Sequence, residues 1–123
     1  MARLYRKYFV MWVNPDIEIV PVVQDEMESW KAHVGRGWHP LLDYFAKNID
    51  YQVSKGDMPP VNISQVKEKY GGLRLYTSGG NDLTDILAAF CEDLSYKYCA
   101  ECGKLAEATD KTGWWQTLCE DCK

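Results

Sequence analysis

The spacing of apolar side chains along the chain predicts three amphipathic helices. Apolar residues recur at intervals of three and four positions, which is the period of a helix with one buried face. Gly35 is suited to end the first helix, and Pro40 is suited to begin the second. The predicted helices cover residues 24–34, residues 40 to about 54, and a third segment that starts at Asn81 or Asp82 and ends near Lys97.

Shorter apolar runs predict β-strands near the start of the chain. Residues 8–13 are continuously apolar, which is typical of a buried strand. Asn14-Pro15-Asp16 forms a turn signal, because proline fixes φ at the first central position of a turn. Residues 17–20 then predict a second, short strand that pairs with the first.

A β-hairpin is predicted between the second and third helices. Segments 61–70 and 73–77 flank Gly71-Gly72, a pair that accepts the positive φ angles of a tight turn. Basic and aromatic side chains interleave along this hairpin, so it is a candidate surface for a protein partner or for a nucleic acid. The alternative is that its tyrosines pack on the third helix while its charges lie in water. The candidate residues are Lys67, Lys69, Tyr70, Arg74 and Tyr76.

Four cysteines close the chain in two C-x-x-C pairs, Cys99 with Cys102 and Cys119 with Cys122. Two such pairs can bring four thiolates onto one tetrahedral Zn²⁺, in a closed structural site that leaves no ligand position for substrate. Gly103 follows the first pair, where a residue that tolerates positive φ is favoured. Segments 105–109 and 114–118 predict a hairpin between the pairs, so this region is predicted to be a zinc ribbon.

The cysteine pairs also permit alternatives to structural zinc. Disulfides fit poorly because the chain has five cysteines and shows no signal peptide. A thioredoxin-like redox pair requires one C-x-x-C at the start of a helix, whereas a rubredoxin-like iron site has similar ligands and is only weakly separable from zinc. An HNH-type nuclease requires a histidine near the pairs, but His33 and His39 lie far upstream.

Three further features have a structural and a functional interpretation. Cys91 lies on the apolar face of the third helix, where a buried free thiol is expected rather than a fifth ligand. His33, His39 and Asp43 could form a second metal site, because His39 and Asp43 are four apart on one helix face. We instead expect His39 to lie at the helix start in a capping or surface role, and His33 to be a half-buried helix residue. Trp114 and Trp115 are expected to pack the ribbon on the third helix. An exposed tryptophan there would instead be an anchor for a partner.

Net charge and motif content limit the possible functions. The formal net charge is −4, which opposes non-specific binding to nucleic acid. The chain has no P-loop, dinucleotide-binding fingerprint or nucleophile elbow, so we expect no enzyme activity. No apolar run approaches the length of a membrane helix, and the expected location is the cytoplasm.

Several distinctive motifs occur together in the second part of the chain. They are Gly37-Trp38, the string QVKEKYGGLRLY at residues 65–76, the first cysteine pair with Gly103, Gly113-Trp114, and Thr117-Leu118-Cys119. In these motifs the chain resembles a group of small phage and prophage proteins of unassigned function that end in a zinc ribbon. The resemblance covers residues 35–122 and implies a phage or prophage origin, hence a host cytoplasm, and bound zinc. It implies no catalytic residue.

These observations predict a small α+β domain of β-hairpins and three helices with a C-terminal four-cysteine zinc ribbon. Residues 1–98 are expected to form the α+β domain, and residues 99–123 the ribbon packed on it. The predicted function is that of a non-enzymatic phage accessory protein that binds a host, defence or phage protein. The alternatives are a nucleic-acid-binding protein that uses the basic hairpin 61–77, and an enzyme of unknown type.

Overall fold

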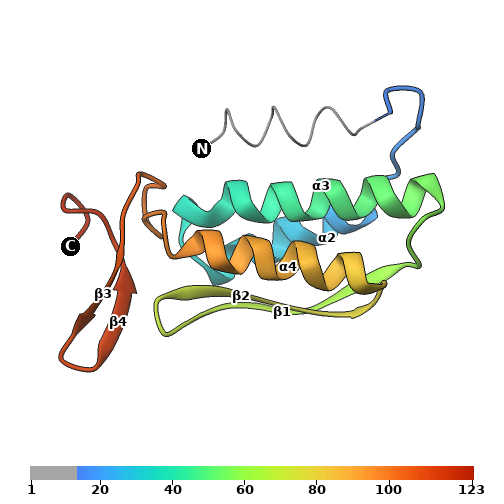
Figure 1. The fold of residues 1–123 in the computed structure, drawn as a ribbon. Helices are drawn as coiled ribbons and strands as arrows, with labels where there is room; N and C mark the ends of the chain where they lie inside the picture. The colour runs from blue at the N-terminus through green and yellow to red at the C-terminus, as the bar shows by residue number, and fades with distance from the viewer. Residues whose placement is uncertain (1–13) are drawn as a thin grey trace.

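A computed structural model describes residues 14–123, and it confirms an α+β fold in which antiparallel hairpins combine with helices. The predicted strand at 8–13 lies outside the described residues. Two short 3₁₀ turns separate the first two helices of the described part (Figure 1). The elements in chain order are α2 (Val22–Trp30), η2 (Lys31–His33), η3 (Arg36–Trp38), α3 (His39–Lys55), β1 (Val61–Lys69), β2 (Gly72–Gly79), α4 (Asp82–Ser95), β3 (Ala108–Lys111) and β4 (Trp114–Thr117).

The strand predicted at 17–20 is wrong, because this segment forms no strand. Its backbone is instead held by side chains of α3. The N–H of Val20 donates to Ser54 Oγ at 2.9 Å, and further upstream the N–H of Asn14 donates to Tyr51 Oη at 2.8 Å. The segment therefore runs beside α3 without a strand partner among the described residues.

The first helix is shorter than the periodicity predicts. Pro21, at its N-cap, has no side chain that can accept from the helix N–H groups. The buried carboxylate of Asp50, on α3, accepts from the N–H groups of Val23 and Gln24, at 2.8 Å each. The first helix ends at Trp30 and continues as the 3₁₀ turn η2, so the last residues of the predicted helix are not α-helical.

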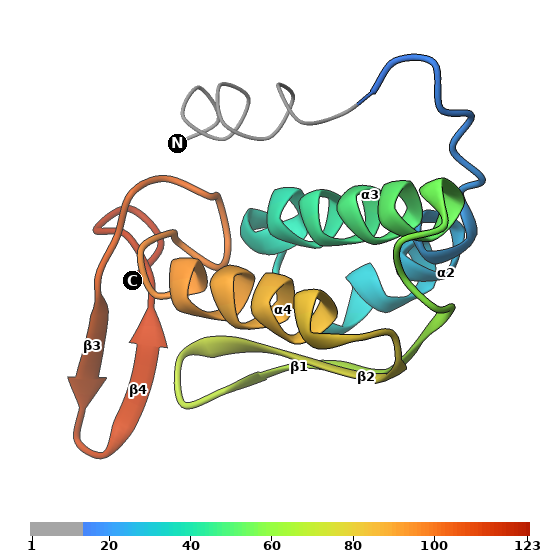
Figure 2. The same ribbon diagram turned by 45° about the vertical axis from the view of Figure 1, so that its right-hand side comes forward.

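The core lies between the helices and the β1–β2 hairpin (Figure 2). Residues at three- and four-residue spacing on α3 are buried, which confirms the predicted amphipathic face. The hairpin contributes alternate residues to the same core, including Val66 and Leu73. The described part of the chain contains no helix that combines the length and apolarity needed to span a membrane.

The turn of the β1–β2 hairpin lies one residue earlier than predicted. Lys69 pairs with Gly72, so the two turn residues are Tyr70 and Gly71, with φ angles of 53° and 81°. Gly72 belongs to β2, where a Cβ would overlap the ring of Tyr96. The second glycine of the pair is therefore required by packing against this tyrosine and not by the turn.

Side chains of α4 fix the hairpin in place. The N–H of Leu73 donates to Ser95 Oγ at 2.8 Å, and the N–H of Leu75 donates to a Glu92 carboxylate oxygen at 2.8 Å. These two N–H groups would otherwise lie unpaired on the edge of a two-stranded sheet. Asn81 caps α4 in a capping box with Thr84, as the sequence predicts for one of its two candidate caps.

Candidate metal centre

Each cysteine pair lies in a tight turn near the end of the chain. Cys99 follows the end of α4 closely, and the N–H of Gly103 donates to its carbonyl oxygen at 2.9 Å. Gly103 has a φ of 82°, which confirms the need for a residue that tolerates this conformation. In the second pair the N–H of Cys122 donates to the carbonyl oxygen of Cys119 at 3.1 Å. Between the pairs, β3 and β4 form a hairpin that turns at Thr112-Gly113, as predicted. Its first strand covers residues 108–111, later in the chain than the predicted segment 105–109.

The two turns bring four sulfur atoms together. All four Sγ atoms lie within 4.8 Å of one another, and Cys102 Sγ lies 3.5 Å from Cys119 Sγ. A tetrahedral site with Zn–S bonds of about 2.3 Å requires sulfurs about 3.8 Å apart. The cluster of Cys99, Cys102, Cys119 and Cys122 could therefore hold a metal ion with little movement.

The pKa values of these thiols indicate that the cluster needs a positive charge before all four can ionise. Burial raises the pKa of Cys99, but backbone N–H groups, including those of Cys119 and Cys102, stabilise its thiolate and lower the pKa to about 6. Hydrogen bonds with the thiols of Cys119 and Cys99 raise the pKa of Cys122 to about 12. Four thiolates cannot ionise side by side without a counter-charge, and a bound metal ion supplies that charge as it displaces the protons.

The first cysteine pair is attached to the core by residues 35–38, here called the 35–38 turn. The N–H of Gly37 donates to the carbonyl oxygen of Ala100 at 2.9 Å. The indole N–H of Trp38 donates to the carbonyl oxygen of Tyr98 at 2.8 Å. A Cβ at Gly35 would overlap the carbonyl oxygen of Ala100, and one at Gly37 would overlap that of Cys99. The two glycines therefore let the backbones of the turn and the cysteine pair meet.

Gly37→Ala is expected to lower the free energy of unfolding by about 1–3 kcal/mol, because the added methyl group meets backbone atoms that have little room to move. It should also weaken metal binding, since the same contact positions Cys99. Chemical denaturation and competition with a colorimetric zinc chelator would measure the two effects.

Gly56→Ala is the matched control. Gly56 has a φ of 92°, but no atom lies within 4 Å of where its Cβ would be. The substitution therefore costs about 1–2 kcal/mol of backbone strain and leaves metal affinity unchanged. Equal metal affinity in both variants would show that the 35–38 turn does not position the site.

The remaining candidate ligands lie outside this cluster. Cys91 is fully buried on α4, and burial raises its pKa to about 12, so the prediction of a buried thiol is confirmed. The His39 ring lies 2.8 Å from the carbonyl oxygen of Lys31, and Asp43 forms an ion pair with the Lys31 ammonium at 2.7 Å. His39 and Asp43 are thus each engaged with Lys31 and form no metal-binding group among the described residues.

The candidate residues of the β1–β2 hairpin form pairs of a cation with an aromatic ring. Lys67 Nζ lies 5.6 Å from the centroid of the Tyr76 ring, and Lys69 Nζ lies 5.5 Å from that of Tyr70. Arg74 donates to Tyr96 Oη at 2.8 Å. The two tyrosines of the hairpin are exposed, so the interpretation that they pack on the third helix is wrong.

Both tryptophans of the ribbon are exposed, so the expectation that they pack on α4 is also wrong. Trp114 is 67 % exposed and Trp115 is 44 % exposed. The β3–β4 hairpin projects from one end of the helices (Figures 1 and 2), and β4 contacts the turn of the β1–β2 hairpin at Gly71. Neighbouring residues of a strand point to opposite faces, so each face of the hairpin carries one indole ring.

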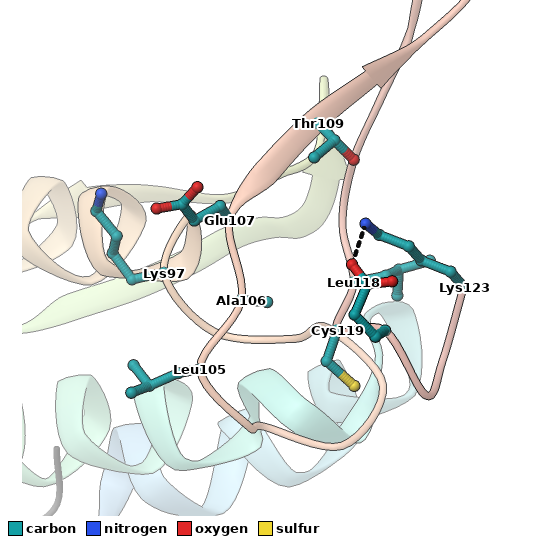
Figure 3. A pocket seen from close by; sticks show the side chains of 9 residues that line it. Lys97, Leu105, Ala106, Glu107, Thr109, Leu118, Cys119 and Lys123 are labelled. Carbon is teal, nitrogen blue, oxygen red and sulfur yellow. Dashed lines mark hydrogen bonds and ion pairs between the residues drawn. The ribbon is translucent and has the colours of Figure 1, made fainter.

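A cavity of about 470 Å³ adjoins the second cysteine pair (Figure 3). Its lining comes from the segment between α4 and β3, from β3 itself and from the residues that follow β4. Lys123 in its wall forms an ion pair with Glu120 at 2.9 Å. Its one cysteine, Cys119, belongs to the metal cluster. The lining residues are Lys97, Leu105, Ala106, Glu107, Thr109, Leu118, Cys119, Glu120 and Lys123.

Two parts of the site do not follow from the sequence alone. The pattern around residues 35–38 predicts only a helix boundary. A helix end requires one glycine, so the presence of both Gly35 and Gly37 before Trp38 is the signal that could have indicated a close backbone contact. Tyr96 gives no local signal that its ring reaches β2.

Comparison with protein-family models, curated proteins and solved structures finds no match to this chain.

Proposed function

We propose that this protein is a small non-enzymatic binding protein, in which a structural zinc ion holds a ribbon that presents aromatic side chains to a protein partner. The observation that carries the proposal is the exposure of Trp114 and Trp115 on a projecting hairpin. Exposed tryptophan is unfavourable in water, and tryptophan is among the residues most enriched at the centres of protein interfaces. The ribbon would thus serve as the contact surface.

The donor set supports zinc as the ion. Four thiolates suit zinc and iron, and zinc favours closed tetrahedral sites that contribute only to folding. Cys99, Cys102, Cys119 and Cys122 would all be ligands, so no position would remain for a reacting water molecule. The metal would supply structural stability and no reaction step.

The charge of the ribbon supports a protein partner over a nucleic acid. Residues 99–123 carry five acidic and three basic side chains, and a four-thiolate zinc site adds two negative charges. Phosphate groups would be repelled from this end of the molecule. The resemblance of residues 35–122 to phage and prophage proteins makes bacterial host proteins, or other phage proteins, the partners that we propose.

Affinity capture with matched variants tests this proposal. Tagged full-length protein and the double variant Trp114→Ala/Trp115→Ala would be incubated with nuclease-treated bacterial lysate, and bound proteins quantified by mass spectrometry. The double variant should lose the specifically captured proteins at unchanged zinc content. Leu105→Ala removes another exposed apolar side chain of the ribbon, 76 % exposed, and should retain them.

The proposal fails if the double variant captures the same proteins in the same amounts. It also fails if capture disappears with nuclease treatment and a Lys67→Ala/Arg74→Ala variant loses binding to single-stranded DNA at low salt. That second result would establish the nucleic-acid alternative.

A further inference from the structure

A groove lies where the two hairpins meet. Thr117 Oγ1 donates to the carbonyl oxygen of Gly71 at 2.7 Å, which attaches β4 to the turn of the β1–β2 hairpin. A Cβ at Gly71 would lie 3.0 Å from the backbone N of Gln116, so the two backbones are in close approach. Beside this contact is an open cavity of about 370 Å³. Its lining residues are Tyr70, Tyr96, Ala108 and Trp115.

The lining consists of three aromatic rings and one methyl group. Tyr70 comes from the β1–β2 turn, Tyr96 from the end of α4, and Trp115 from β4. Tyr70 is 67 % exposed. Three separate elements thus place aromatic rings around one open groove, and such rings give large contact areas with little loss of side-chain entropy.

The charges around the groove are of both signs. On the side of the β1–β2 hairpin, Lys69 Nζ lies 5.5 Å from the Tyr70 ring centroid, and the Arg74 guanidinium lies 5.7 Å from that of Tyr96. On the side of the β3–β4 hairpin, Asp110 is the cross-strand partner of Trp115 and shares its face. A nucleic acid would bring a phosphate at every nucleotide toward this carboxylate in a protein of net charge −4.

We propose that this groove binds a proline-rich extended segment of the protein partner, with Trp115 as its anchor and an acidic residue of the segment beside Lys69 and Arg74. The proposal rests on the proposed function, and it names the chemistry of the partner. Polyproline II segments present flat pyrrolidine rings to aromatic grooves, and they are already extended before binding. The two cations on one side of the groove complement an acidic residue and give the segment a direction.

The other ribbon tryptophan provides a matched control. Trp114 lies on the same strand as Trp115, is more exposed, and points to the opposite face. It does not line this groove. Binding in the groove should therefore depend on Trp115 and not on Trp114. Non-specific hydrophobic binding to the ribbon would depend on both.

The test uses full-length zinc-loaded protein labelled with ¹⁵N and a short synthetic peptide of consecutive prolines followed by a glutamate. The peptide should shift the indole N–H signal of Trp115. Trp115→Ala should weaken its affinity at least about tenfold, and Trp114→Ala should change it less than about twofold. A peptide with alanine in place of each proline should bind at least about tenfold more weakly.

Several outcomes would overturn this inference. They are no binding of the proline peptide at millimolar concentration, equal binding of the alanine peptide, and equal losses in the two tryptophan variants at unchanged zinc content. Oligothymidylate that shifts the Trp115 signal where the proline peptide does not would assign the groove to single-stranded nucleic acid.

The two proposals can fail separately. Suppose that Trp114→Ala/Trp115→Ala loses its captured proteins but the wild-type protein does not bind the proline peptide. The proposed binding function then stands, and the assignment of a proline-rich segment to the partner is wrong. If the peptide binds through Trp115 while the double variant keeps its captured proteins, the groove is a peptide site but the ribbon is not the main contact surface.

Discussion

Cys102→Ser is expected to unfold the β3–β4 hairpin and the second cysteine pair, and to leave the helical core folded. The ribbon has almost no apolar core of its own: its buried residues are Cys99, Thr117 and Cys119. Binding free energies of about 10–16 kcal/mol are typical of structural zinc sites in small domains, and here they would replace the missing core. Removal of zinc by a chelator should have the same effect. In NMR spectra of the backbone amides, the signals of the ribbon should lose their dispersion, whereas the signals of α3 and α4 should persist.

Cys91→Ala is the control for the loss of a thiol. Its sulfur is buried in the core, where it points to the carbonyl oxygen of Leu41 at 3.7 Å, in an environment separate from the ribbon sulfurs. This variant should keep its full metal content. Freshly purified wild-type protein that contains neither zinc nor iron, or a Cys102→Ser variant with an intact ribbon spectrum, would refute the metal centre.

Trp38→Ala is expected to lower the free energy of unfolding by about 3–5 kcal/mol, the usual cost of removing a large buried aromatic side chain. Trp38 is fully buried, and its indole N–H is the partner of the Tyr98 carbonyl oxygen, one residue before Cys99. The substitution leaves a cavity and removes the partner of this carbonyl. Urea denaturation followed by circular dichroism would measure the loss.

Two variants separate the components of this effect. Trp38→Phe keeps most of the ring volume but lacks the N–H, so its main cost is the unpaired carbonyl, about 1–3 kcal/mol. Trp114→Ala removes the same side chain from an exposed position and should change stability by less than about 0.5 kcal/mol. A loss below about 1 kcal/mol for Trp38→Ala would contradict the role of this side chain as the link between core and ribbon.

The elements that depend on local pattern can be predicted from the sequence. The apolar face of α3, the cap of α4 and the two cysteine turns each follow from residues close together in the chain. The sequence also predicts both hairpins, because a turn signal lies between two apolar segments in each. The turn of the β1–β2 hairpin differs from the prediction by one residue, because either glycine of the pair accepts positive φ and only Tyr96 shows which one must lack a side chain.

The features that the sequence does not reveal depend on residues far apart in the chain. Asp50 caps a helix that begins almost thirty positions earlier, and no local pattern connects a carboxylate on one helix with the start of another. The exposure of Trp114 and Trp115 is hidden for a similar reason. Strand periodicity predicts which faces they occupy, but only the position of the hairpin at one end of the helices shows that both rings stay exposed.

The attachment of the first cysteine pair to the 35–38 turn has a consequence for the order of metal loading. Cys99 and Cys102 are held by the core through backbone contacts, whereas Cys119 and Cys122 follow a hairpin that the Thr117 to Gly71 hydrogen bond attaches to the core. We therefore expect a freshly synthesised chain to capture the ion first on the core-bound pair, in an incomplete two-thiolate complex. Closure by the tail would then be an intramolecular step, with a rate independent of protein concentration and set by how fast a chain of about fifteen residues returns on itself.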